Sequence, residues 1–209
     1  MRHTLRLLLT ISALFVAGAA FAACEGQLPA KAQQAINASN PDLANFSTSV
    51  RYYMNIERCK RGITPFSADT RLMKAATVHS NYMAGARSLT HNSNVQGYRN
   101  LNERMHSANV TMHTAGENIG QNFLFVLGGK EISTFTRGKC KFTYTNSVTD
   151  VPQHSYGSLA HELVQSWLAS AQHRKNMLNR QFTRMEASFG FAQDDTTCGY
   201  IFASQNFAG

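Results

Sequence analysis

Two aromatic-rich segments near the C-terminal end constrain the fold of this chain most strongly. The segments "MEASFGFAQ" (185–193) and "CGYIFASQNF" (198–207) are separated only by the polar "DDTT". Aromatic and β-branched residues on both sides of a short polar turn are typical of two strands that pair as an antiparallel hairpin. A sheet that contains this hairpin needs an apolar layer packed against it, and the preceding sequence must supply that layer.

Helical spacing of apolar residues supplies such layers upstream. One helix begins near Ser67 or Asp69, either of which suits an N-cap, and its apolar stripe continues to Met83. The most periodic helix is predicted over 158–179. Its apolar face is formed by Leu159, Leu163, Val164, Trp167 and Leu168. Helices packed on an antiparallel sheet define an α+β fold.

Shorter segments complete the predicted elements. A helix is expected over 49–62, and one short helix around 101–108 interrupts a polar stretch that resembles a surface loop. The glycine-bracketed run 116–129 is either a strand or a short helix, and 139–147 alternates polar and aromatic residues as a strand or hairpin arm does. Residues 23–48 have little apolar content and are expected to form an N-terminal arm.

The N-terminal residues are typical of an export signal. Arg2 and Arg6 precede an apolar run that ends in small residues, so we expect a secretory signal peptide over 1–22. The run is short for a membrane span, and no transmembrane segment is expected once it is removed. Residues 49–209 are expected to form one domain of a secreted or periplasmic protein.

Four cysteines in an exported chain are expected to form two disulfides. Three connectivities are open, and we expect Cys24 with Cys59 and Cys140 with Cys198. The alternative is a lipoprotein in which Cys24 becomes the lipid-modified first residue. Phe21 is a poor residue three positions before such a cysteine, and lipidation of Cys24 would leave an odd number of cysteines.

The formal net charge of the chain is +8 at pH 7, and loss of the two arginines of the leader lowers it to +6. A basic exported protein favours anionic surfaces such as envelope polymers or lipid headgroups. Nucleic acid is not expected as a partner, because the basic residues are scattered and no nucleic-acid-binding motif accompanies them.

Glu117 lies between Gly116 and Asn118 at the start of an apolar run. An ionised carboxylate is costly to bury unless it is paired or hydrogen-bonded, so Glu117 requires a partner or an opening to water. His91 and His173 are candidate partners, because neither fits an apolar stripe and imidazoles bind metal ions or exchange protons near neutral pH.

The other histidines of the mature chain are assigned structural or solvated roles. The segment "HELVQ" begins like the helix motif of zinc proteases, but Gln165 replaces the second histidine, so His161 is interpreted as a surface residue. His79 lies on the apolar stripe of its helix and is expected to be a core histidine with a local hydrogen bond. The histidines of polar stretches are expected to be solvated: His106, His113 and His154.

Five stretches, in this order, resemble the CAP superfamily of cysteine-rich secretory proteins, antigen 5 and pathogenesis-related proteins (SCP domains), especially its bacterial exported members. They are "NIERCKRGITPFSADTRLMKAATVHSNYMA", "THNS", "AGENIG", "WLASAQHRKNMLNRQFTRMEASFGFA" and "YIFASQNF". The resemblance implies an α-β-α sandwich, with a central antiparallel sheet between helical layers. It also implies a cleft lined by two histidines and two acidic residues, and it assigns His91, His173 and Glu117 to that cleft.

The chain departs from the family pattern at two places. Ser170 occupies the position of the second acidic residue, and Glu162 does not replace that residue, since on a continuous helix it lies about 16 Å from His173. The second departure is an insertion at about 125–157. It either covers the cleft or forms a hairpin pinned to the C-terminal strands through Cys198.

Three functions are consistent with these observations. We favour a binding module for a lipid, a glycan or another envelope component. The alternative is a metal-dependent, protease-like hydrolase, in which His91 and His173 bind zinc and Glu117 activates water; a variant uses Ser170 and His173 as nucleophile and base. The third is a non-catalytic structural or partner-binding protein whose polar residues form a buried network. Zinc is the one cofactor that the residues suggest.

Overall fold

The computed structural model describes residues 24, 26–136, 140–194 and 197–209, so the expected signal peptide lies outside the described residues. The helices are η1 (Ala30–Gln33), α2 (Leu43–Cys59), α3 (Thr70–Ala86), α4 (Leu101–Ser107), α5 (Tyr156–Ala169) and α6 (Ala171–Met177). The strands are β1 (Ala115–Phe123), β2 (Ile132–Thr136), β3 (Lys141–Tyr144), β4 (Arg184–Ala192) and β5 (Tyr200–Ala208).

A three-stranded antiparallel sheet with the order β1-β5-β4 lies at the centre of the fold. The predicted C-terminal hairpin is confirmed, because β4 and β5 pair antiparallel with Glu186 opposite Asn206. Strand β1 pairs with the other side of β5, which places Glu117 opposite the same Asn206. Directly opposite residues share a face, so these three side chains project to one side of the sheet.

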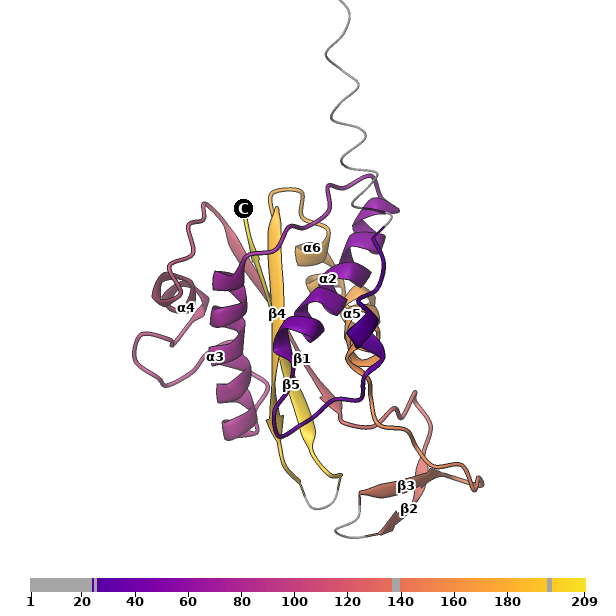
Figure 1. The fold of residues 1–209 in the computed structure, drawn as a ribbon. Coiled ribbons are helices and arrows are strands. Elements are labelled where there is room, and N and C mark those ends of the chain that lie inside the picture. Colours follow the sequence, from indigo (N-terminus) through magenta and orange to yellow (C-terminus); the bar gives the residue numbers. More distant parts are fainter. Residues whose placement is uncertain (1–23, 25, 137–139, 195–196) are drawn as a thin grey trace, which may run out of the picture.

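Helices cover both faces of this sheet, which confirms the predicted α-β-α sandwich (Figure 1). Helix α3 packs on the face of Glu117, whereas α2 and α5 pack on the opposite face with most of the apolar core. Phe46 of α2 contacts Phe189 of β4 there, with 5.0 Å between ring centroids. The Trp167 indole is buried on α5 and donates to the carbonyl of Ile119 at 2.9 Å.

Helix α2 begins earlier than the sequence indicated. It starts at Leu43 rather than at Ser49, because the Asp42 side chain accepts a hydrogen bond from the Asn45 backbone N–H and caps the helix. Phe46 then reaches the core, so the last residues of the expected N-terminal arm belong to a core helix.

The predicted long helix over 158–179 is two helices. Ser170 ends α5 and precedes α6 with an extended backbone, φ −80° and ψ 123°, which interrupts the helical path. Ser170 and His173 therefore do not lie on one continuous helix, and the separation of Glu162 from His173 does not follow from helical rise.

The insertion contains a second, two-stranded sheet formed by β2 and β3. Both expected disulfides are present, and Cys140–Cys198 fastens this hairpin to the end of the central sheet, while Cys24–Cys59 fastens the arm to α2. Figure 1 shows the hairpin beyond the ends of β4 and β5, far from α4. Of the two alternatives, the structure shows the pinned hairpin.

Arg58, at the end of α2, is fully buried and binds a ring of main-chain oxygens. Its guanidinium donates to the carbonyls of Thr64 at 2.7 Å and of Met177, Asn179 and Phe182 at 3.0 Å each. Burial lowers the pKa of Arg58 to about 10, which still leaves it charged at neutral pH. One side chain thus joins α2 to the turn between α6 and β4.

Candidate functional site

The candidate site is built around the Glu117 carboxylate on β1, which is 7% exposed. Arg104 of α4 is fully buried and donates through Nη2 to both carboxylate oxygens, at 2.9 Å and 2.8 Å. The same nitrogen lies 3.2 Å from the carbonyl of His91, and Nη1 lies 3.4 Å from the carbonyl of Tyr98. The guanidinium therefore links the edge strand to the loop between α3 and α4.

Two histidines approach the same carboxylate. The Nδ1 atom of His91 lies 2.9 Å from Glu117 Oε1, and more than half of the His91 side chain is exposed. His79 of α3 is fully buried, with Nε2 3.8 Å from Glu117 Oε1 and 2.7 Å from the carbonyl of Thr90. The expected local hydrogen bond of His79 is confirmed, and the residue also belongs to the site.

Strand β5 completes the surroundings of the carboxylate. The Ser204 hydroxyl donates to Oε2 at 3.2 Å. The Asn206 amide, oriented with its nitrogen toward Glu117, donates to Oε2 at 3.2 Å and accepts from the Ala76 N–H at 3.0 Å. We call Glu117, Arg104, His91, His79 and Ser204 the Glu117 cluster.

Electrostatics keep Glu117 ionised. Burial by itself raises the pKa of the carboxyl, but the hydrogen bond from His91 and the charge of Arg104 outweigh burial, so the pKa of Glu117 lies below its ordinary value. Burial also lowers the pKa of His79, so its imidazole is neutral at pH 7. The cluster therefore holds one buried ion pair beside a neutral histidine.

His173 lies on α6 in the opposite layer, and among the described residues its imidazole makes no hydrogen bond or ion pair with Glu117, which the sequence had paired it with. Asn118 follows Glu117 on the strand and points to the other face, where its amide donates to the main-chain carbonyl of His173 at 3.2 Å. Asn176 of α6 donates to the Asn118 side chain at 2.9 Å. Burial lowers the pKa of the His173 imidazole, and the nearby imidazole of His91 lowers it further.

Among the described residues, neither Ser170 nor Glu162 makes a hydrogen bond or an ion pair with the Glu117 carboxylate. Within the described chain, the Ser170 hydroxyl makes no capping hydrogen bond to α6. Glu162 accepts from Asn122 at 3.1 Å and lies 3.5 Å from His154 Nε2. The expectation that His154 is solvated is wrong, because its ring is buried beside α5, with Nδ1 2.9 Å from the Ser158 hydroxyl. His106, His113 and His161 are exposed, as expected.

Sequence reasoning missed Arg104, the main partner of Glu117. The short helix around it was predicted, but its polar stretch was interpreted as surface loop. The signal that could have found Arg104 is the carboxylate itself, because a buried acid needs a cation as its partner. Only histidines were considered as partners of Glu117, and arginines were not. Met105, the next residue, is also fully buried and marks α4 as a packed element.

The residues present do not fit a resident zinc centre. Both carboxylate oxygens of Glu117 accept hydrogen bonds from Arg104, and the Nδ1 atom of His91 also lies against this carboxylate. Of the predicted ligands, only the imidazoles of His91 and His173 then remain. Catalytic zinc typically has three protein ligands. Among the described residues, no three His, Cys, Asp or Glu side chains are grouped in a way that suits a metal ion.

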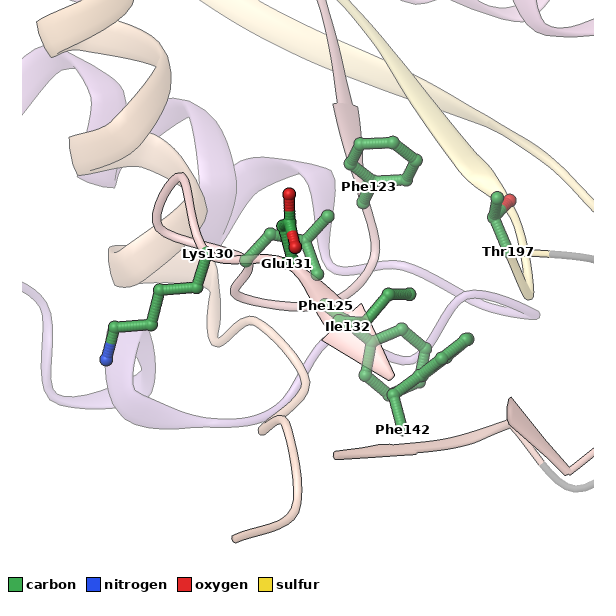
Figure 2. A pocket seen from close by; sticks show the side chains of 8 residues that line it. Phe123, Phe125, Lys130, Glu131, Ile132, Phe142 and Thr197 are labelled. Carbon is green, nitrogen blue, oxygen red and sulfur yellow. The ribbon is translucent and has the colours of Figure 1, made fainter. Parts of the chain in front are cut away.

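An apolar cavity of about 420 Å³ lies between the end of β1 and the inserted hairpin (Figure 2). The rings of Phe125 and Phe142 contact one another in its wall, with centroids 4.9 Å apart. Its other lining residues are Phe123, Leu127, Lys130, Glu131, Ile132 and Thr197. In the part of the chain that the structure describes, no helix has both the length and the apolar character needed to cross a membrane.

The α-β-α sandwich is the fold that the resemblance to the CAP superfamily implied. The sequence model of the Cysteine-rich secretory protein family (CAP) matches residues 51–207. This chain therefore belongs to the CAP family. The comparison with curated protein sequences gives no match.

One solved structure supports the same fold, and two others are similar over parts of their chains. An extracellular protein containing an SCP domain from Bacillus anthracis is similar, with 23% identity and a TM-score of 0.51, over 79% of this chain and 40% of that one. An outer surface protein from Borrelia burgdorferi has 14% identity and a TM-score of 0.49, over 76% and 88% of the two chains. A cysteine-rich secretory protein from Staphylococcus aureus has 18% identity and a TM-score of 0.43, over 80% and 39%. This chain thus spans less than half of the Bacillus protein.

Proposed function

We propose that this protein is an exported binding domain rather than a hydrolase. The observation that carries this proposal is the engagement of Glu117 by Arg104, His91 and Ser204. A general base needs a free lone pair and a pKa near the working pH, and Glu117 has a lowered pKa and no oxygen free of a cation. The carboxylate is suited to holding structure and unsuited to activating water.

We propose that the Glu117 cluster positions the loop between α3 and α4. Arg104 holds the main chain of that loop through the carbonyls of His91 and Tyr98 while it neutralises Glu117. His91 and His173 then serve as polar groups at the edge of the sheet, and Ser170 serves as the break between two helices. In this proposal the Glu117 cluster has the role of the buried polar network, which was the third alternative in the sequence analysis.

The proposed ligand is a lipid of the cell envelope with an anionic headgroup. The cavity at the hairpin has aromatic and aliphatic walls and a volume of about 420 Å³, within the range of small-molecule sites. Such walls suit a hydrocarbon chain. The surrounding segment 125–157 carries four basic and two acidic residues, and the whole chain is basic, so a negative headgroup is favoured. Two disulfides are consistent with an oxidising location outside the cytoplasm.

Co-sedimentation of the purified protein with vesicles tests this proposal. We expect binding to vesicles rich in phosphatidylglycerol and little binding to pure phosphatidylcholine. Ile132→Glu adds a charge at the cavity wall, where the side chain is partly exposed, and should weaken binding at least tenfold. Leu89→Glu makes the same change at an exposed site outside the cavity and should bind as the wild type does.

Other outcomes would redirect the assignment. Equal binding to both vesicle types would remove the lipid proposal, and binding to a soluble anionic polysaccharide without vesicle binding would favour the glycan alternative. The hydrolase would be favoured by elemental analysis that finds stoichiometric zinc in the wild type and none in His91→Ala.

A further inference from the structure

The loop that follows β3 carries the most exposed large apolar side chain among the described residues. Val148 is 98% exposed, and the loop around it, residues 145–149, is exposed and contains no charged residue. The loop is held in shape by its own hydrogen bonds. The Ser147 N–H donates to the carbonyl of Tyr144 at 3.0 Å, and the Thr149 N–H donates to the Ser147 hydroxyl at 3.0 Å. Folding therefore gains almost nothing from burial of Val148, which stays accessible to an outside partner.

A second exposed apolar side chain lies at the same end of the hairpin. Ile132 begins β2, pairs with Tyr144 at the end of β3, and is 39% exposed. The turn from Tyr144 to Ser147 keeps the following loop close to this pair. Ile132 also lines the apolar cavity (Figure 2). We call Ile132, Tyr144 and residues 145–149 the hairpin tip, and one of its apolar side chains thus belongs to the cavity wall.

The hairpin that carries this tip is basic. Residues 134–149 include three basic residues and no acidic one. One of them, Lys141, begins β3 and is exposed. Lys130 lies beside the tip, with its Nζ atom 4.9 Å from the centroid of the Tyr144 ring. Glu131 and Asp150 flank the basic segment, so residues 130–150 carry four basic and two acidic side chains. The excess of positive charge favours an anionic surface.

We infer that the hairpin tip docks this protein on an anionic lipid bilayer, with Val148 inserted among the headgroups. Exposed apolar side chains with basic residues beside them are the combination that binds a protein to such a surface. The inference rests on the proposed function for its choice of partner, because a cavity that takes a lipid is filled most directly at a bilayer. A protruding valine on an uncharged loop offers little of the contact area that a stable protein interface needs.

The position of the hairpin in the fold suits this contact. Figure 1 shows β2 and β3 at the lower edge of the described chain, apart from the helices that cover the central sheet. A planar surface can therefore reach the hairpin without meeting those helices. The disulfide between Cys140 and Cys198 ties the hairpin to the end of the sheet, so docking through the tip also fixes how the domain stands on the bilayer.

The fluorescence of introduced tryptophans tests which residues meet the bilayer. The single native tryptophan, Trp167, is buried in the core and remains clear of lipid. Vesicles of phosphatidylglycerol with brominated acyl chains should quench the emission added by Val148→Trp about twofold or more, and should leave that of Gln181→Trp unchanged. Gln181 is exposed and precedes β4, at the far end of a nine-residue strand that spans about 30 Å. Equal quenching of the two variants, or no quenching of Val148→Trp, would overturn the inference.

Matched charge substitutions separate a local effect from a general one. Val148→Asp should weaken sedimentation with phosphatidylglycerol vesicles about tenfold, because it replaces the apolar group by a negative charge. Lys141→Glu should weaken it about tenfold as well, whereas Lys175→Glu, the same charge reversal at an exposed position of α6, should weaken it about twofold at most. Equal effects of the two lysine variants, or full binding by Val148→Asp, would contradict docking through the tip.

A soluble probe separates this inference from the proposed function. Val148 is not among the described residues that line the cavity, so Val148→Asp should bind a dansylated fatty acid in solution as the wild type does, whereas Ile132→Glu should not. Fatty-acid binding without quenching of Val148→Trp would overturn the docking and leave the cavity proposal standing. Quenching of Val148→Trp without fatty-acid binding would remove the cavity proposal and support the docking.

Discussion

Glu117 and Arg104 form an ion pair from which water is almost excluded, so each residue depends on the other. Removing water from two charges is costly, and the cost is offset here by two short hydrogen bonds and by the loop carbonyls that Arg104 also binds. The need of Glu117 for a partner could be predicted from its apolar surroundings. Its contact with His91 agrees with the prediction, whereas the predicted contact with His173 is not found among the described residues. The cation was not predicted, because nothing local distinguishes Arg104 from the other arginines of a polar stretch.

At this scale we predict the effect of Glu117→Gln on stability. The variant leaves Arg104 charged, buried and unpaired, so the free energy of unfolding should fall by about 3–5 kcal/mol. Urea unfolding followed by circular dichroism measures the change. Glu103→Gln breaks an ion pair of similar length with Arg99 on the surface and should have little effect. A Glu117→Gln variant as stable as the wild type would show that the pair does not hold the loop.

At the scale of elements, the pairing of the C-terminal strands was predicted, whereas the break between α5 and α6 was not. The C-terminal strands carry their aromatic pattern and turn within a short segment, so their pairing was readable. The break between α5 and α6 was not, because Ser170 lies in a sequence that is compatible with a continuous helix. The helix ends there because α6 turns to place Asn176 on Asn118 of β1, a tertiary contact that local propensity does not encode.

The close approach of α3 to β4 yields the second prediction. A Cβ on Gly190 would lie 2.4 Å from the carbonyl oxygen of Ser80, so Gly190→Ala forces the helix away from the sheet. We expect a loss of about 1–3 kcal/mol of stability, measured by chemical unfolding. Gly85→Ala, on the exposed side of α3 with no atom within 4 Å of the new Cβ, should instead stabilise by about 0.5–1 kcal/mol. Equal effects of the two substitutions would contradict this packing.

At the scale of the whole molecule, buried titratable groups dominate the response to acid. Burial lowers the pKa of His79, His154 and His173 in the folded state, so the unfolded chain binds more protons once the pH falls below about 6.5. Hydrogen bonds from Arg71 lower the pKa of Asp69, and the pKa of Glu117 is also below its ordinary value. These two carboxylates therefore stabilise the folded state above about pH 4, and this stabilisation is lost in stronger acid.

We therefore predict that the free energy of unfolding falls in two stages, first between about pH 6.5 and 5 and again below about pH 4. Urea titrations at a series of pH values measure both stages. His154→Gln should reduce the slope of the first stage, because one buried imidazole is removed, whereas His161→Gln changes an exposed ring and should not. A constant free energy between pH 7 and 5 would contradict the prediction.

The ring of carbonyls around Arg58 has a consequence for the order of folding. Three of the carbonyl oxygens that the Arg58 guanidinium binds belong to residues 119 to 124 positions later in the chain. Contacts between such distant segments slow folding, because a large loop must close before they form. During synthesis, the first helix of the core therefore emerges with a cation whose acceptors have not yet been made. We expect a nascent chain truncated before residue 177 not to reach native packing, even after prolonged incubation.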